Sequence, residues 1–177
     1  MCAKPLQAKP ERPLALIKGS KGGTSLARDW KPGVHGQPET QGRCYRNFLE
    51  TIRLATEQLK RDGHTFVVRG VLWHQGESDV KSGQEIYQQR LTTFIARLRE
   101  DLEKPELPVV IGEVFDNEGK RDAVRRAQRA VADTVLYTGF AAADGLKTSD
   151  AGTHFDAASQ LILGERFAAA MLKLQEH

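Results

Sequence analysis

Two short clusters of polar side chains contain the groups that could do chemistry in this chain. The first, Trp73-His-Gln-Gly-Glu-Ser-Asp79, follows the apolar run Phe66–Leu72, which has the length and valine content of a strand buried on both faces. Ligand sites of parallel α/β sheets lie beyond the carboxyl ends of the strands. We therefore expect His74, Gln75 and Glu77 at the rim of a cleft. The alternative is an ordinary strand followed by a solvated turn.

The second cluster is Ser149-Asp-Ala-Gly-Thr-His-Phe-Asp156. A carboxylate shortly before a histidine on a glycine-containing loop, as Asp150 is before His154, can hold one ring nitrogen of the imidazole. An imidazole oriented in this way is what activation of a nucleophile requires. Taken alone, however, the segment is explained more simply as a helix-capping loop with a surface histidine.

The elements that must position these clusters alternate between strands and helices. Amphipathic spacing, capping signals and apolar runs predict strands at 14–17, 66–72, 108–115 and 134–137, and helices at 45–62, 82–102 and 120–133, with a last helix capped by Asp156. The first strand would lead into the glycine-rich loop Gly19–Ser25. This order predicts an α/β fold whose parallel sheet is wound by right-handed crossovers, so that both polar clusters converge on one edge of the sheet.

Two of the predicted helices have informative faces. The helix at 120–133 would turn Val124, Ala127 and Val131 inward. Its outward face would carry four arginines, namely Arg121, Arg125, Arg126 and Arg129. Such a run of charges usually indicates a solvated helix face; the alternative is a patch for an anionic ligand. The core side of the last helix is expected to include Leu161, Phe167, Met171 and Leu174.

Length and composition limit the possibilities further. The 177 residues are 40% hydrophobic, which fits one domain at 14–177 after a flexible lead-in at 1–13. Twenty-six basic and 23 acidic residues are interspersed and give no nucleic-acid signature. Cys2 and Cys44 match no disulfide framework or metal-ligand spacing. Without a long apolar run or the apolar core of a signal peptide, we expect a soluble protein with no membrane partner, and the compartment stays open.

Three segments together resemble blocks of the sialate O-acetylesterase and acetylxylan esterase family of SGNH (GDSL-like) hydrolases. They are Lys18-Gly-Ser-Lys-Gly-Gly-Thr-Ser-Leu26, the cluster Trp73–Asp79, and Asp150-Ala-Gly-Thr-His-Phe-Asp-Ala-Ala-Ser-Gln160. The blocks occur in the family's order, the resemblance runs from about Leu14 to Leu172, and His-Gln-Gly-Glu is its most specific part. It implies a flavodoxin-like, three-layer α/β/α fold that removes O-acetyl groups from carbohydrates through a serine nucleophile, with no metal and no cofactor.

The resemblance also implies roles for individual residues. His154 would be the general base and Asp150 would orient it, although the family usually places this aspartate three residues before the histidine and not four. Glu77 is the rival carboxylate. The oxyanion hole would use backbone N–H groups of Gly22 or Gly23 and the side-chain amide of Gln75. His74 could contact substrate or only stabilise the turn, and Trp30 and Trp73 could line a sugar site or belong to the core.

The family's first block, a strand followed by Gly-x-Ser-Asn with the nucleophile, does not occur in this sequence. Three hypotheses follow. The chain is an N-terminally truncated form of a longer enzyme; or Ser20, and less well Ser25, takes the place of the nucleophile; or the chain is a catalytically silent, carbohydrate-binding relative. Both serines could equally serve only hydrogen bonds within a tight loop. Loss of a strand from the sheet would expose strand edges and favour a homo-oligomer.

Overall fold

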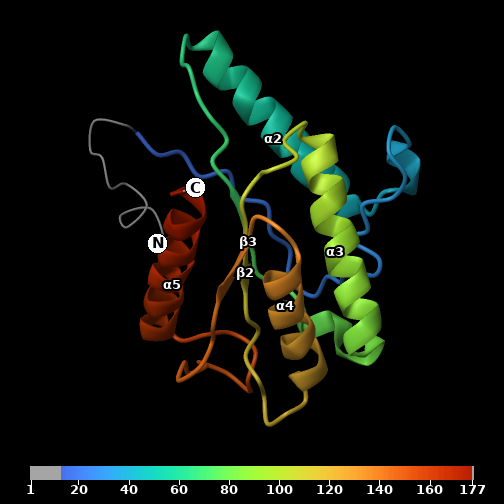
Figure 1. Cartoon of the computed structure of the whole chain (residues 1–177), viewed down its shortest axis with the longest axis vertical. Helices are drawn as coiled ribbons and strands as arrows, with labels where there is room; N and C mark the ends of the chain where they lie inside the picture. The colour runs from blue at the N-terminus through green and yellow to red at the C-terminus, as the bar shows by residue number, and fades with distance from the viewer. Residues whose placement is uncertain (1–12, 177) are drawn as a thin grey trace.

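Three parallel strands form the centre of the fold (Figure 1). The computed structural model describes residues 13–176, so nearly all of the predicted lead-in lies outside the described residues. The strands β1 (Val71–Trp73), β2 (Val109–Gly112) and β3 (Thr138–Ala141) are hydrogen-bonded in the order β1-β2-β3. Val71 lies opposite Val109, which lies opposite Thr138. The predicted α/β class with a parallel sheet is confirmed.

Helices cover both faces of this sheet, which makes three layers. In Figure 1, α5 lies on one side of the strands, while α3 and α4 lie on the other, and α2 crosses behind the upper part of α3. The bounds are α2 (Arg43–Arg61), α3 (Gln84–Asp101), α4 (Asp122–Thr134) and α5 (Ala157–Gln175), with short 3-10 helices η1 (Pro38–Thr40) and η2 (Glu77–Ser82). One apolar core fills the space between sheet and α2–α4, and another lies under α5.

The larger core is built on the predicted apolar stripe of α3. Its residues at helical spacing are all buried, namely Tyr87, Leu91, Phe94, Ile95 and Leu98. Phe94 contacts Trp73 at a ring-centroid distance of 4.2 Å, and Trp73 contacts Trp30 at 5.3 Å. Both tryptophans are buried. They therefore belong to the core, although Trp30 also lines a hollow beside Ser20.

Two strand predictions near the start of the chain are wrong or too long. Residues 14–17 form no strand, and Leu16 is 56% exposed, because no other strand among the described residues pairs with this segment. The run 66–72 becomes a strand only at Val71, and Val67 is 69% exposed. The reason is that β1 lies at the edge of the described sheet and pairs only with β2, whose pairing begins at Val71, so residues 66–70 have no strand to pair with.

The later elements contain smaller corrections. The last strand lies at Thr138–Ala141 and not at 134–137, because α4 continues to Thr134 and Tyr137 turns the chain with a φ of 56°. Ser82 and Glu85 have the spacing of a capping box, but the N-cap of α3 is Gly83 and no side chain caps this helix. Leu161 is exposed, since α5 turns Leu163, Phe167 and Met171 toward the sheet in its place. Asp156 does cap α5, accepting a hydrogen bond from the Ser159 backbone N–H at 2.7 Å.

Candidate functional site

The two polar clusters meet beyond the carboxyl ends of the strands. His74 directly follows β1, and its imidazole packs edge to face against Phe155, the neighbour of His154, with ring centroids 5.8 Å apart. Phe115, after β2, contacts the same Phe155 ring at 6.1 Å. The predicted convergence on one sheet edge is therefore confirmed, and an aromatic contact connects the two clusters.

The expected pairing of Asp150 with His154 is present in the structure. The Nδ1 atom of His154 is hydrogen-bonded to Oδ2 of Asp150, while Oδ1 accepts from the backbone N–H groups of Thr153 at 2.8 Å and His154 at 3.0 Å. The pKa of Asp150 is lowered to about 2, first by the His154 backbone N–H, then by that of Thr153 and by the imidazole. The His154 side chain is 77% exposed. The imidazole thus has one nitrogen held and the other open to an incoming group.

The spacing of four residues between Asp150 and His154 is accommodated by Gly152. This glycine has a φ of +88°, a left-handed conformation that favours glycine, and a Cβ there would collide with the Asn117 side chain. The extra residue relative to the family pattern is therefore absorbed in a turn that only glycine fits.

The lowered pKa of Asp150 predicts a pH dependence for this loop. Because the pKa in the folded state lies below the ordinary 3.8, the pairing contributes stability above that value and loses it as the pH falls through about 2. We expect the Thr153 and His154 amide signals in NMR spectra to shift with a midpoint near 2 and to lose this transition in Asp150→Asn. A midpoint near 3.8 in the wild-type protein would contradict the hydrogen-bonded geometry.

Glu77, the rival carboxylate, is associated with His74 and not with His154. Its Oε2 accepts from the Gly76 N–H at 3.1 Å, and its Oε1 lies 3.9 Å from His74 Nε2. Although 29% of the His74 side chain is accessible, its ring packs against Phe155 and Phe167. This burial lowers the pKa of His74, and the charge of Glu77 opposes the shift only in part. Of the two carboxylates, Asp150 is therefore the one that is hydrogen-bonded to the His154 ring.

Gln75 does not have a free amide for an oxyanion. The side chain is buried, and its Nε2 donates to the Thr24 carbonyl at 3.0 Å and to Asp79 Oδ2 at 2.7 Å. Both hydrogens of the amide are thus engaged within the protein, which contradicts the expected role as an oxyanion donor in this conformation. Its function in the structure is to connect the glycine-rich loop to the cluster after β1.

Asp79 is a residue of this site that the sequence analysis did not identify as important. It is buried and, besides Gln75, accepts hydrogen bonds from the backbone N–H groups of Leu26 at 2.7 Å and Ala27 at 3.2 Å. The available signal was an aspartate at the end of a cluster that otherwise holds candidate catalytic groups. Its partners, more than 50 residues earlier in the chain, could not be inferred.

Replacing Asp79 with alanine should release the glycine-rich loop. Three donors would lose their acceptor, and each buried donor left unsatisfied costs about 1–3 kcal/mol. We expect a lower free energy of unfolding in urea by at least that amount, with faster hydrogen exchange of the Leu26 and Ala27 amides. Asp133→Ala, an exposed aspartate on α4, is the control. Equal exchange rates in both variants would show that Asp79 does not hold the loop.

The candidate serines and glycines lie in the same loop but do not reach His154. Gly22 and Gly23 are exposed, and a Cβ on either residue would meet open space. The N–H and hydroxyl of Ser25 both contact Asp29 Oδ2, at 3.0 and 3.4 Å, so Ser25 stabilises its own turn. Ser20 is exposed and lines a hollow of about 460 Å³ against α2. Among residues 13–176, no hydroxyl group is hydrogen-bonded to the His154 ring.

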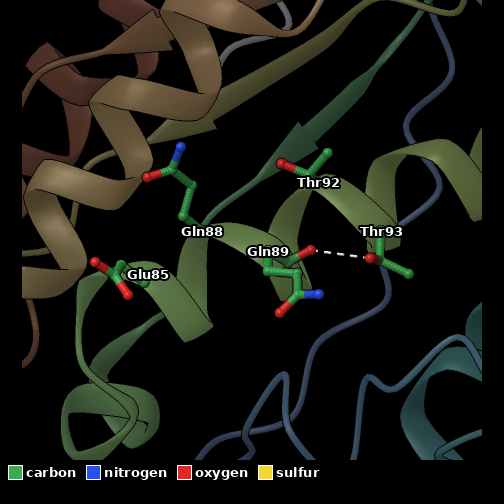
Figure 2. Close-up of a pocket in the computed structure, with 5 residues that line it drawn as sticks. All are labelled: Glu85, Gln88, Gln89, Thr92 and Thr93. Carbon is green, nitrogen blue, oxygen red and sulfur yellow. Dashed lines mark hydrogen bonds between the residues drawn. The ribbon is translucent and has the colours of Figure 1, made fainter.

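A second hollow, of about 340 Å³, lies apart from the polar clusters. Figure 2 shows that its lining comes from one surface of α3, namely Glu85, Gln88, Gln89, Thr92 and Thr93. The Thr93 hydroxyl donates to the Gln89 carbonyl within the helix. Since no candidate residue lines this hollow, we do not include it in the site.

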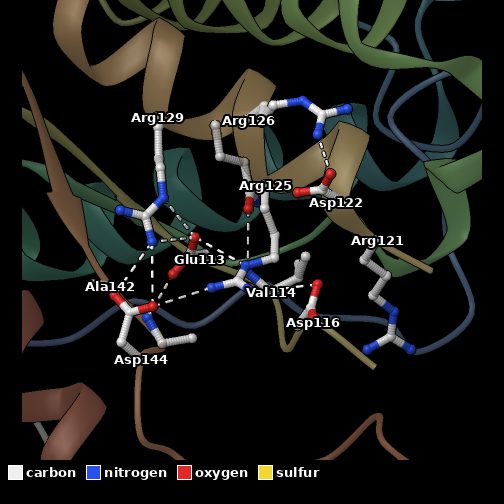
Figure 3. A network of polar contacts seen from close by, with 12 residues as sticks. Glu113, Val114, Asp116, Arg121, Asp122, Arg125, Arg126, Arg129, Ala142 and Asp144 are labelled. Carbon is white, nitrogen blue, oxygen red and sulfur yellow. Dashed lines mark hydrogen bonds and ion pairs between the residues drawn. The ribbon is translucent and has the colours of Figure 1, made fainter. Parts of the chain in front are cut away.

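The arginine face of α4 is only partly solvated, because Arg121 and Arg125 are covered while Arg126 and Arg129 are exposed. Glu113, directly after β2, is fully buried, and its Oε1 accepts from Arg125 Nε at 3.0 Å and from Arg129 Nε at 2.9 Å (Figure 3). Its Oε2 accepts from the Ala143 N–H at 2.8 Å. Burial disfavours the charged form of Arg125, but its bonds to Glu113 and Asp116 outweigh this and raise its pKa.

The surrounding acids neutralise this face. Arg125 and Arg129 both contact Asp144, at 3.3 and 3.2 Å, so the cluster has no surplus of free arginines for an anionic ligand. Arg126, paired with Asp122, and Arg129 are exposed and match the predicted solvated face. The fourth arginine, Arg121, is buried.

Neither a candidate metal cluster nor a helix able to span a membrane occurs in the described part of the chain. Within residues 13–176, no group of three or more histidine, cysteine or acidic side chains is placed to hold a metal ion. None of the helices in that part of the chain combines the length and apolarity needed to cross a bilayer.

Comparisons with known proteins agree on one family. The profile described as carbohydrate esterase, sialic acid-specific acetylesterase, matches residues 2–173. A protein of Arabidopsis thaliana named as a probable carbohydrate esterase is 29% identical over 163 residues, which are 90% of this chain and 55% of the relative. The crystal structure of the same Arabidopsis protein superposes with a TM-score of 0.67, covering 86% of this chain and 58% of that one. The chain thus spans little more than half the length of this relative.

Proposed function

We propose, from the premise that this chain belongs to the carbohydrate esterase family described as sialic acid-specific acetylesterases, that it takes part in the hydrolysis of O-acetyl esters of carbohydrates. The observation that carries the proposal is the Asp150–His154 pair, in which one imidazole nitrogen is held by a carboxylate and the other is open. This is the arrangement of a general base in serine-type ester hydrolysis.

In the proposed reaction, His154 takes the proton of a serine hydroxyl as the serine oxygen attacks the acetyl carbonyl carbon. The bond to the sugar oxygen then breaks, and the imidazolium returns its proton to that oxygen. Water, deprotonated by His154, then attacks the carbonyl carbon of the acetyl-serine. The bond to the serine oxygen breaks, the imidazolium returns the proton to that oxygen, and acetic acid leaves and ionises to acetate. Asp150 keeps the imidazole oriented and stabilises its positive charge in each half of the reaction.

The developing oxyanion would be stabilised by backbone N–H groups of the glycine-rich loop. Gly22 and Gly23 are the proposed donors because they are exposed and the surrounding space is open. One such donor is typically worth ~2.7–4 kcal/mol in the transition state. Gln75 is not included, since its amide already donates to Thr24 and Asp79.

Ser20 is the proposed nucleophile within the described residues. It is exposed and has an open hollow beside it, whereas Ser25 is engaged with Asp29. For Ser20 to react, the loop would have to bring its hydroxyl to His154, to which no described hydroxyl is bonded.

The second candidate function is carbohydrate binding without hydrolysis. Two observations favour it: neither candidate serine contacts the His154 ring, and the Gln75 amide is occupied. In this case the site would still bind acetylated sugars. Self-association, predicted from exposed strand edges, stays a prediction.

A serine-directed phosphonate separates these functions. The wild-type protein, His154→Ala and Ser20→Ala would be treated with the reagent and mapped by mass spectrometry, and acetate release from p-nitrophenyl acetate and O-acetylated sugars would be followed in parallel. Labelling at Ser20 that needs His154 supports the esterase. Hydrolysis without labelling at Ser20 places the nucleophile elsewhere. Sugar binding with neither labelling nor hydrolysis supports the binding function and overturns the esterase proposal.

A further inference from the structure

Arg121 precedes α4 and is only 7% exposed, although it was expected on a solvated face. Figure 3 shows its guanidinium directed away from the cluster around Glu113. One terminal nitrogen donates to the Gly152 carbonyl at 2.6 Å and to the Phe115 carbonyl at 3.3 Å, and the other donates to the Thr153 hydroxyl at 3.2 Å. No carboxylate of the described residues forms an ion pair with it.

The hydrogen-bond partners of Arg121 lie in the loop that carries Asp150 and His154. Gly152 and Thr153 are two of the three residues that separate Asp150 from His154. Asp150 accepts from the backbone N–H groups of Thr153 and His154, so its position depends on the conformation of this link. Arg121 connects the link to Phe115 after β2, which belongs to the body of the domain.

We propose that Arg121 is a positioning residue, which fixes Gly152 and Thr153 so that Asp150 stays aligned with the His154 imidazole. The effect of this positioning on catalysis rests on the proposed function. A buried cation without a carboxylate partner is costly, and here neutral oxygens of the His154 loop satisfy it. The connection is independent of whatever group His154 activates.

The geometry needs a guanidinium and not only a positive charge. Arg121 spans three acceptors with two nitrogens in a planar fork, which the single ammonium of lysine cannot reproduce. On its other side, Gly152 is packed against Asn117 so closely that no Cβ would fit. The link is therefore held from two directions, and its conformation should depend on both.

The test uses Arg121→Lys and Arg121→Gln, with Arg126→Gln as the matched control from the exposed side of the same helix. The pKa of the Asp150 carboxyl is measured by ¹³C NMR, together with hydrogen exchange of the His154 amide. The wild-type protein and the control should show a pKa of about 2. In both Arg121 variants it should rise toward 3.8, the ordinary value, because the loop no longer directs its N–H groups at Asp150. Because Arg121→Lys keeps the positive charge, a rise of the Asp150 pKa in this variant would come from the lost hydrogen-bond geometry and not from a lost charge.

Circular dichroism checks that each variant is folded. A folded Arg121→Lys protein with an Asp150 pKa still near 2 and unchanged His154 exchange would overturn the proposal. If neither Arg121 variant folds, Thr153→Val removes one acceptor alone and should still speed His154 amide exchange; no change would likewise overturn it. Acetate release is measured separately: a wild-type protein without esterase activity would refute the proposed function, while the titration still decides the role of Arg121.

Discussion

Replacing His154 with alanine is expected to reduce kcat for ester hydrolysis by about 10²–10⁴-fold, the usual contribution of a general acid–base group. The imidazole is the one group in the site with a carboxylate on one nitrogen and open space at the other. Without it, the nucleophile keeps its proton and the leaving sugar oxygen receives none. Since His154 acts mainly in the transition state, KM should change much less than kcat.

Initial rates with p-nitrophenyl acetate and with an O-acetylated sugar measure this effect. His35→Ala is the matched control, because His35 is also an exposed histidine beside carboxylates, Asp101 and Glu100, but on a different part of the surface. The control should keep the wild-type rate. Equal rates in His154→Ala and the wild-type protein would exclude His154 as the base, and a similar loss in the control would point to a general effect of histidine removal on folding.

Replacing Glu113 with alanine is expected to lower the free energy of unfolding by about 3–5 kcal/mol, the cost of removing one partner from a buried ion pair. Glu113 is fully buried, and the change leaves the Arg125 and Arg129 guanidinium groups without their inner partner. It also leaves the Ala143 N–H without its acceptor. Because Ala143 begins the loop that carries Asp150 and His154, the same change should loosen the site.

Urea unfolding of Glu113→Ala, Glu113→Gln and Asp122→Ala separates the contributions. Glutamine keeps an acceptor for the Ala143 N–H but replaces the oxygen that accepts from Arg125 and Arg129 with an NH2 donor. Its effect should be the smaller of the two because the Ala143 N–H stays paired. Asp122 pairs with Arg126 on the same helix but at the surface, where such pairs contribute about 0–1 kcal/mol. If Glu113→Ala were no less stable than Asp122→Ala, the buried cluster would not contribute to stability.

The family match shows what kind of protein this chain is, and the geometry shows which side chains contact His154. Membership of the carbohydrate esterase family is established by the match over residues 2–173. The structure adds three contacts: Asp150 is hydrogen-bonded to His154, Glu77 lies beside His74, and the Gln75 amide donates to Asp79. The identity of the nucleophile is therefore the point on which the proposed esterase depends.

The sequence by itself determined the features that arise from neighbouring residues. The apolar stripe of α3, the buried run of β2 and the cap of α5 by Asp156 follow from local spacing, and each is present. The pairing of Asp150 with His154 is of the same kind, because a turn of four residues is enough to bring the two side chains together. Alternation of these elements was also enough to predict the parallel sheet.

Only the tertiary structure decided which polar groups are buried and what they contact. Asp79 meets the backbone of Leu26, 53 residues away, and Arg121 meets Gly152, 31 residues away. Helical spacing placed Arg121 and Arg125 on the polar face of α4, but it could not reveal that loops after the strands cover these two side chains. Such contacts depend on how the crossovers bring distant segments together, and the cost of burying a polar group then makes each partner necessary.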